Sequence, residues 1–233
     1  MTKQKGGQYI AEALVREGIP YVFGVCGHGT VGLIDELFNV RNDVKMISPR
    51  HEQTAVHMAD GFFRVSHKVA ATLTATGPGS ANQIMGLAVA QTDSSAILSI
   101  TANVPTQQFN RGPFQELNLH NQADFNSVIR PVVKRSFQPT RVEMLPLQIR
   151  QACATMTTGR PGPVNLDIPY NLFQEEDDLA QEVVGSAFGE RRPGASPNDV
   201  KDTVDRLLAA ERPVIFVGHG VTLSEASEEL TKL

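Results

Sequence analysis

The amino-acid sequence predicts an α/β fold: a doubly wound, parallel, six-stranded sheet with flanking helices, followed by the start of a second α/β domain. Two observations lead to this fold class. Short apolar runs alternate along the chain with longer stretches of helical period, which is the pattern of crossover units in a parallel sheet. Hydrophobic residues make up 41% of the 233 residues, which is enough for a packed core.

Six apolar runs are expected to form the strands of the sheet. In chain order they are Tyr21–Val25, Val44–Ile47, Val69–Ala75, Ala96–Thr101, Val132–Ser136 and Val164–Ile168. A helix from about Glu52 to Ser66 follows the second run, and its apolar residues fall on one broad face that can pack on the sheet. These residues are Ala55, Met58, Ala59, Phe62 and Phe63.

The loops that follow the strands are expected to form the ligand site. In open parallel sheets, ligands bind outside the carboxyl ends of the strands, where loops lead into helix N-termini. Four loops should therefore converge at that edge, at residues 24–30, 49–53, 75–82 and 101–105.

The composition changes after the last strand. Residues 1–170 are expected to form the first domain, and the acidic and then Gly-, Arg- and Pro-containing stretch at 171–195 is expected to be an interdomain linker. Residues 196–233 then predict the start of a truncated middle domain. Ser196-Pro197 indicates a helix N-terminus with the helix running to about Glu211, followed by a strand at 213–217 and another helix from about Ser224.

Charge and composition make several classes of protein improbable. The 21 basic and 25 acidic residues give a net charge of −4 with no basic block, so nucleic acid is not an expected partner. No run approaches the ~20 apolar residues that cross a bilayer, and the N-terminus has no apolar signal, so we expect a cytoplasmic protein. Cys26 and Cys153 show no metal-binding spacing, and Cys153 is expected to lie in the core.

Two motifs carry most of the functional information. Pro49-Arg50-His51-Glu52-Gln53 opens the helix after the second strand, and Gly77-Pro78-Gly79-Ser80-Ala81-Asn82 follows the third. Six shorter motifs accompany them in order. They are Tyr21-Val22-Phe23-Gly24, Thr92-Asp93-Ser94, Asn103-Val104-Pro105, Phe114-Gln115-Glu116, Arg130-Pro131-Val132-Val133-Lys134 and Gly159-Arg160-Pro161-Gly162-Pro163-Val164. Over residues 4 to 170, the chain resembles the N-terminal, pyrimidine-binding domain of thiamine-diphosphate enzymes, in the group of acetolactate synthase, glyoxylate carboligase and benzoylformate decarboxylase.

The resemblance implies that Glu52 is the catalytic glutamate. In this family a carboxylic acid hydrogen-bonded to N1′ of the cofactor's aminopyrimidine favours the imino tautomer, whose nitrogen accepts the thiazolium C2 proton. By position alone, Glu52 could simply complement a helix dipole, but the surrounding motifs favour catalysis. The resemblance also assigns Gly27, Pro78, Gly79 and Asn82 to cofactor binding, since missing side chains let a backbone approach closely. An ordinary turn with Asn82 on a helix surface stays open.

Three further residues have roles that the resemblance suggests. Gln115 matches a position that faces the thiazolium and substrate, with ordinary loop polarity as the alternative. His28, in the turn after the first strand, is expected to transfer protons to or from substrate, or else to be a solvated loop residue. Arg160 matches an arginine that contacts flavin in acetolactate synthases. In flavin-free relatives the same motif shapes a turn, so FAD binding stays open.

The resulting hypothesis is an N-terminal part of a thiamine-diphosphate-dependent carboligase or lyase acting on a 2-keto acid such as pyruvate. His28 and a long segment at 117–129 favour an alternative, hydrolysis of a carbon–carbon bond in a cyclic dione. A second alternative is a non-catalytic module or split subunit. The family's Mg²⁺ and diphosphate site lies in a third domain that these 233 residues do not contain. The resemblance therefore implies that this chain has no metal ligands and no activity alone. In this family the site forms between domains of different protomers, so the resemblance also implies a homodimer or homotetramer for the whole protein.

Overall fold

The computed structural model describes residues 3–117, 124–179 and 194–233. They fall into two compact units that divide between residues 189 and 190, and each unit is described by itself. No helix of the described residues is both long and apolar enough to pass through a bilayer.

The first unit contains the predicted parallel six-stranded sheet. Its strands lie in the order β3-β2-β4-β5-β7-β6, and all neighbouring pairs are parallel. Their bounds are β2 Tyr21–Gly24, β3 Lys45–Ile47, β4 Ala70–Thr74, β5 Ile97–Asn103, β6 Arg135–Phe137 and β7 Val164–Pro169. The fold class predicted from the alternation of apolar runs is therefore confirmed.

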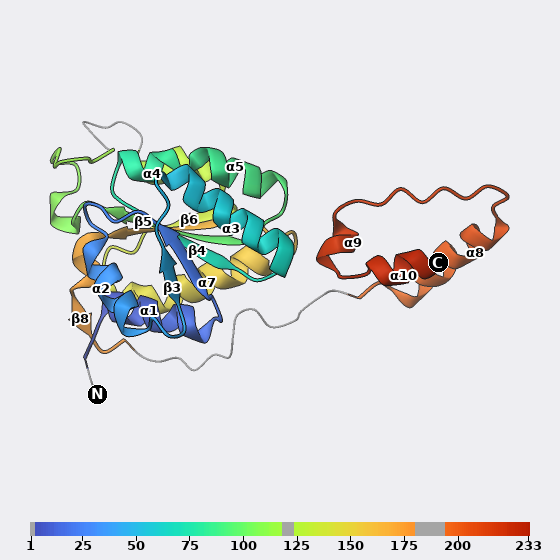
Figure 1. Cartoon of the computed structure of the whole chain (residues 1–233), viewed down its shortest axis with the longest axis horizontal. Coiled ribbons are helices and arrows are strands. Elements are labelled where there is room, and N and C mark those ends of the chain that lie inside the picture. The colour runs from blue at the N-terminus through green and yellow to red at the C-terminus, as the bar shows by residue number, and fades with distance from the viewer. Residues whose placement is uncertain (1–2, 118–123, 180–193) are drawn as a thin grey trace. The chain divides into compact units, whose positions relative to one another are not determined.

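Helices cover both faces of the sheet, as Figure 1 shows. On one face lie α1 Gly6–Arg16, α2 Val31–Asn39 and α7 Leu145–Thr157. On the other lie α3 Glu52–Ser66, α4 Pro78–Asn82, α5 Ile84–Thr92 and α6 Phe125–Ile129. Helix α3 has the predicted bounds, and Ala55, Ala59 and Phe63 on its inner face are buried while Met58 and Phe62 are partly buried against the same core. On α7, Cys153 is buried as expected, and this burial raises the pKa of its thiol.

Short helices and a second small sheet complete the unit. The 3₁₀ helices are η1 Thr106–Gln108, η2 Arg130–Val132, η3 Val142–Met144 and η4 Tyr170–Phe173. Strand β6 begins three residues later than the expected Val132, because Pro131 and its neighbours form η2, and proline favours the first turn of a helix over a paired strand. The antiparallel sheet pairs β1 Gln4–Lys5 with β8 Glu176–Asp177.

The segment after β7 differs from the expected linker beginning at residue 171. Leu172 and Phe173 of η4 are fully buried, and the backbone N–H of Gly6 donates to the Glu175 carbonyl at 3.0 Å. Residues 171–177 therefore belong to the first unit, because two apolar side chains and a strand pairing fasten them there. The stretch at 180–193 lies outside the described residues.

The second unit consists of α8 Pro197–Ala209, α9 Gly220–Leu223 and α10 Ser227–Lys232. Helix α8 starts at the Ser196-Pro197 boundary that the sequence indicated. The strand expected at 213–217 is not formed: Phe216 is 98% exposed, and the described part of this unit offers no second strand with which the backbone could pair. The last helix begins three residues after the expected Ser224.

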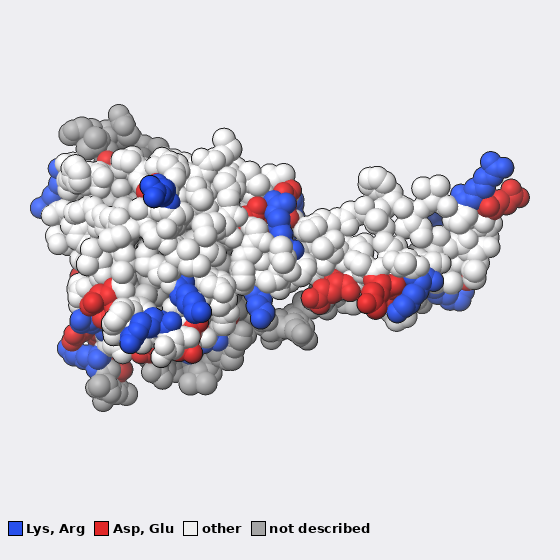
Figure 2. Space-filling model, in the orientation of Figure 1, with Lys and Arg blue, Asp and Glu red and all other residues white. Residues whose placement is uncertain are grey.

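Charged side chains of both signs are interspersed on the molecular face seen in Figure 2. Blue and red residues alternate there among uncharged ones, in keeping with the near balance of 21 basic and 25 acidic residues.

Candidate functional site

The candidate site begins where the strand order reverses. The chain passes from β2 to its outer neighbour β3 and returns to β4 on the other side of β2, so the loops after β2 and β4 start side by side. A Cβ added to Gly27 would lie only 2.7 Å from the Ala75 Cβ. The backbone N–H and hydroxyl of Thr76 both donate to the His28 carbonyl, at 3.3 and 3.4 Å. The two loops are therefore in direct contact, as the convergence of loops at this edge predicts.

Glu52 lies beside this junction as the first residue of α3. The helix is capped by His51, whose Nδ1 accepts from the Gln53 backbone N–H at 3.2 Å. The Glu52 side chain is half-buried, and its Oε2 accepts from Asn82 Nδ2 at 2.9 Å. A Cβ on Gly79 would lie 3.1 Å from Glu52 Oε1. Glu52, Gly79 and Asn82 are thus brought together. The Glu52 carboxyl is partly exposed to solvent and is in contact with helix α4.

The Gly-Pro-Gly sequence is explained by two close approaches. Gly77 has a φ of 66°, and a Cβ there would lie 2.3 Å from the Gln115 carbonyl oxygen. At Gly79, a Cβ would be crowded against the Glu52 carboxyl. Between them, Pro78 is exposed and occupies the first position of α4, where a missing N–H costs nothing.

Gln115 combines an unusual backbone with an unsatisfied side chain. Its φ is 66°, a left-handed conformation that is uncommon for a residue with a Cβ. Its Oε1 is buried without a hydrogen-bond partner among the described residues. Buried polar atoms are nearly always paired in folded proteins, so an unpaired one at a site where strain is also stored indicates a ligand group or a water as its partner.

His28 lies in an aromatic cluster at the mouth of the same junction. Its ring makes edge-on contacts with Phe114 and Tyr170, with ring centroids 5.8 and 5.2 Å apart. His28 remains exposed, and Phe114 is 72% exposed. The sequence analysis did not single out Tyr170. Its signal was its position directly after the carboxyl end of β7, where ligand-facing residues occur in this kind of sheet.

Arg160 is not part of this cluster. Its Nε donates to Ser94 Oγ at 2.7 Å, and its Nη2 donates to the carbonyls of Gln91 and Thr92 in the last turn of α5. Helix α5 ends just before β5 begins, so Arg160 lies at the amino ends of the strands, whereas Glu52 lies at the carboxyl ends. A cation here satisfies carbonyls that the helix leaves unpaired. The structure therefore does not bring Arg160 to the other residues expected to bind cofactor.

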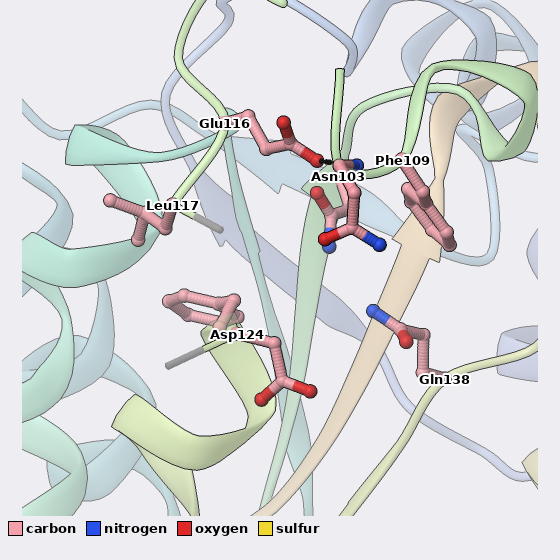
Figure 3. A pocket seen from close by; sticks show the side chains of 8 residues that line it. Asn103, Phe109, Glu116, Leu117, Asp124 and Gln138 are labelled. Atoms are coloured by element: carbon pink, nitrogen blue, oxygen red, sulfur yellow. Dashed lines mark hydrogen bonds between the residues drawn. The ribbon is translucent and has the colours of Figure 1, made fainter. Parts of the chain in front are cut away.

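A polar cavity of about 180 Å³ lies next to the Gln115 loop. Figure 3 shows Glu116, Asn103 and Gln138 around it. Glu116 accepts from the backbone N–H groups of Asn110 and Gly112 at 2.7 and 2.9 Å, which fixes the loop that carries Gln115.

Two side chains that line this cavity, Asn103 and Gln138, donate to a buried carboxyl that the sequence analysis missed. Asp167 Oδ2 accepts from Asn103 and Gln138 at 2.6 and 2.7 Å, and its Oδ1 accepts from the Thr101 hydroxyl at 2.8 Å. Burial disfavours the charged form and raises the pKa of Asp167 to about 6, against the opposing effect of the three hydrogen bonds. A charged residue inside the apolar run Val164–Pro169 was the available signal. The described residues contain no cluster of three or more His, Cys, Asp or Glu residues that could hold a metal ion.

Comparison with known proteins places these features in a family. A family model described as "Thiamine pyrophosphate enzyme, N-terminal TPP binding domain" matches residues 4–124, which confirms the resemblance. Thiamine pyrophosphate is another name for thiamine diphosphate.

Several curated relatives are similar over nearly the whole chain. The "Probable acetolactate synthase large subunit" of Methanocaldococcus jannaschii is 36% identical over 98% of this chain and 38% of its own length. The "Acetolactate synthase large subunit" of Haemophilus influenzae is 34% identical over 99% of this chain and 39% of its own length. The "Acetolactate synthase isozyme 3 large subunit" of Escherichia coli is 31% identical over 99% of this chain and 39% of its own length. The chain thus spans about two fifths of the length of these relatives.

Proposed function

Because the chain belongs to the thiamine pyrophosphate enzymes, as their N-terminal TPP-binding domain, we propose that it is part of a carboligase or lyase of the acetolactate synthase type. The proposed substrate is a 2-keto acid such as pyruvate. The observation that carries the proposal is the contact of Glu52 with Asn82 and with the bare backbone of Gly79, at the switch point of the sheet.

The residues at this point fit the aminopyrimidine end of thiamine diphosphate. The missing side chains of Gly27 and Gly79 let their backbone pack closely on Ala75 and on the Glu52 carboxyl. Pro78, next to Gly79, is exposed, so a bound ring can approach the backbone here. Asn82 holds the Glu52 carboxyl through a hydrogen bond, and the unpaired Oε1 of Gln115 can accept one hydrogen bond from a bound group. When bound, the cofactor supplies a nucleophilic carbon for addition to the substrate's keto group.

The chain's own residues would move protons and orient the substrate. Glu52 exchanges a proton with the ring nitrogen of the aminopyrimidine, which general acid–base catalysis requires of a carboxyl at this place. His28, held by Phe114 and Tyr170 and still exposed, orients substrate or moves a proton on it. Gln115 faces the reacting end of the site.

The experiment is binding of thiamine diphosphate and Mg²⁺ to the chain by calorimetry, with Glu52→Gln as the test variant. Glu143→Gln is the matched control, since Glu143 is another first-turn glutamate, lies in η3 and is exposed. We expect weak binding that Glu52→Gln reduces and Glu143→Gln leaves unchanged. Binding that is equal in all three proteins would argue against the Glu52 site.

A second candidate activity is hydrolysis of a carbon–carbon bond in a cyclic dione. The aromatic clamp on His28 favours it, because a fixed imidazole suits proton transfer to a ring-opened product. The long segment noted at 117–129 lies partly outside the described residues. Assays of the complete protein with pyruvate and with a cyclic 1,2-dione separate the two activities, since rapid turnover of pyruvate contradicts the hydrolase.

The remaining partners are also proposals. We propose a homodimer or homotetramer for the complete enzyme, with Mg²⁺ held by residues outside those described. FAD has less support, because the Arg160 guanidinium is bonded to the end of α5. We propose that this chain by itself is inactive, as a split subunit or a binding module would also be. Turnover by the purified chain without a partner would contradict this proposal.

A further inference from the structure

Buried polar side chains form two rows across the sheet, on the face covered by α3 and α5. Strand register aligns Thr72, Ser99, Asn165 and Ser136 in one row and Thr74, Thr101 and Asp167 in the other. All except Ser136 are at most 1% exposed. Two residues closer to the amino ends of these strands, on the same face, Ala70 and Ile97 belong to the apolar core. This face is therefore apolar at one end and polar at the end that carries the candidate site.

Gln83 connects these rows to the candidate site. It is fully buried at the junction of α4 and α5. Its Oε1 accepts from the Ser99 hydroxyl at 2.7 Å, and its Nε2 donates to Thr74 Oγ1 at 3.4 Å. The Thr74 hydroxyl lies 3.2 Å from Ser80 Oγ, which itself donates to the Ala75 carbonyl at 2.7 Å. The hydrogen bonds thus run continuously from β5 through Gln83 to the start of α4.

Helix α4 depends on such anchors. It is five residues long, far below the length at which an isolated helix is stable. Ser80 within the helix and Gln83 directly after it, three residues apart, attach one side of this segment to Thr74 of β4 and Ser99 of β5. Gly79 and Asn82, also three residues apart, face the Glu52 carboxyl. The buried anchors of α4 therefore determine where Asn82 stands relative to Glu52.

We propose that Gln83 is a positioning residue for Glu52: its buried amide fixes α4 so that Asn82 donates to the Glu52 carboxyl. A methionine at this position has a similar volume but can neither accept from Ser99 nor donate to Thr74. Two of the neighbouring hydroxyls keep other partners, since Ser99 lies within reach of Asn165 Nδ2 and Thr74 keeps Ser80, whereas the Thr72 hydroxyl loses its long 3.5 Å bond to Gln83 Oε1. Loss of the amide therefore loosens α4 and leaves the sheet in place. The inference builds on the proposed function, because it assigns how the Glu52 site is held.

The test uses the full chain without cofactor and measures Asn82 directly by nuclear magnetic resonance. The side-chain NH₂ signals of Asn82 are assigned by their disappearance in Asn82→Ala. Glu52→Ala gives their position when the acceptor is missing. Gln91→Met is the matched control, because Gln91 is a glutamine in the last turn of α5, whereas Gln83 is the residue just before its first turn, beside α4. Circular dichroism and thermal unfolding report whether each variant retains the fold.

We expect Gln83→Met to move the Asn82 signals to their position in Glu52→Ala and to accelerate hydrogen exchange of the Ala81 amide about tenfold, with the folded spectrum retained. Gln91→Met should leave both unchanged. Asn82 signals that stay at the wild-type position in folded Gln83→Met overturn the proposal. If Gln83→Met does not fold, Ser99→Ala removes the 2.7 Å bond to Gln83 together with one 3.5 Å contact of Asn165 Nδ2, which keeps the Ser99 carbonyl and Thr101 Oγ1 as partners. A partial shift of the Asn82 signals then supports the proposal, and no shift overturns it.

Failure of thiamine diphosphate to bind would count against the proposed function alone, because these signals are read without cofactor.

Discussion

Replacing Gly77 with alanine is expected to destabilise the first unit, because two costs meet at this residue. Its φ of 66° and ψ of −111° form a conformation that residues with a Cβ rarely adopt. The new Cβ would also lie 2.3 Å from the Gln115 carbonyl oxygen, whereas contacts under 3.0 Å essentially do not occur. Either the turn before α4 or the Gln115 loop must move by more than half an ångström.

The two costs can be separated by a second glycine. Gly159 has the same φ of 66°, and a Cβ there would meet nothing within 4 Å. Gly159→Ala therefore carries only the backbone cost, about 1–3 kcal/mol. Gly77→Ala carries this and the steric cost of overpacking, about 1–3 kcal/mol more. The difference between the two variants contains this steric cost and any additional backbone cost of the Gly77 ψ of −111°, so it sets an upper limit on how firmly the Gln115 loop is packed on the turn.

The assay is urea unfolding followed by circular dichroism, with the free energy of unfolding and the denaturant slope fitted for each variant. We expect Gly77→Ala to lower the free energy of unfolding more than Gly159→Ala, with similar slopes. Equal losses in the two variants would refute the reasoning, since they would mean that the Gln115 loop does not press on Gly77. The placement of Gln115 beside the Glu52 cluster would then be wrong as well.

Three further predictions concern single side chains. Glu52→Gln should leave thermal unfolding unchanged and slow exchange of the cofactor's C2 proton in the complete enzyme by about 10²–10⁴-fold, measured by proton NMR in D₂O; wild-type exchange would contradict the assignment. Asp167 has a pKa of about 6 in the folded protein against an ordinary value of 3.8, so the folded state binds this proton more tightly than the unfolded chain. Its contribution to the free energy of unfolding should therefore fall by about 3 kcal/mol as pH rises through that window, and Asp167→Asn should remove this dependence. Urea unfolding at pH 4 and pH 7 checks it, and identical pH dependence in the two proteins would count against it. Arg160→Ala should cost about 1 kcal/mol of stability by freeing the end of α5, and should leave thiamine diphosphate binding unchanged; a weakened affinity would return Arg160 to the site.

Local periodicity accounts for the parts of the fold that sequence reasoning predicted. The bounds of α3 follow from a 3.6-residue apolar repeat and a capping position, both of which are properties of neighbouring residues. Non-local pairing accounts for the errors. Residues 213–217 have a strand-like apolar run but no neighbour to pair with among the described residues, and Leu172 and Phe173 are too few to form a pattern although both are core residues.

In the candidate site, too, features that depend on local sequence were predicted and features that depend on partners far away in the sequence were not. The contact of Glu52 with Asn82 and Gly79 lies where the ordered motifs indicated, because those motifs sit at the carboxyl ends of predicted strands. Gln83 and Asp167 were not found, because a polar residue in an apolar run reveals its role only when its partners on other strands are known. Arg160 differs from these residues, since its motif has a cofactor role in the resembling family while its side chain here donates hydrogen bonds to a helix end.

The position of β7 has a consequence for synthesis of the chain. Although β7 is the last strand of the large sheet to be made, it lies between β5 and β6, and it supplies the only partner of β6 within that sheet among the described residues. While a ribosome has yet to release residues 164–169, β6 lacks its hydrogen-bonding neighbour and β5 exposes an open edge, which is a surface prone to wrong pairing. The sheet can therefore be completed only after residues 164–169 have left the ribosome, so this domain is expected to fold once its last strand has been made rather than progressively from its N-terminus.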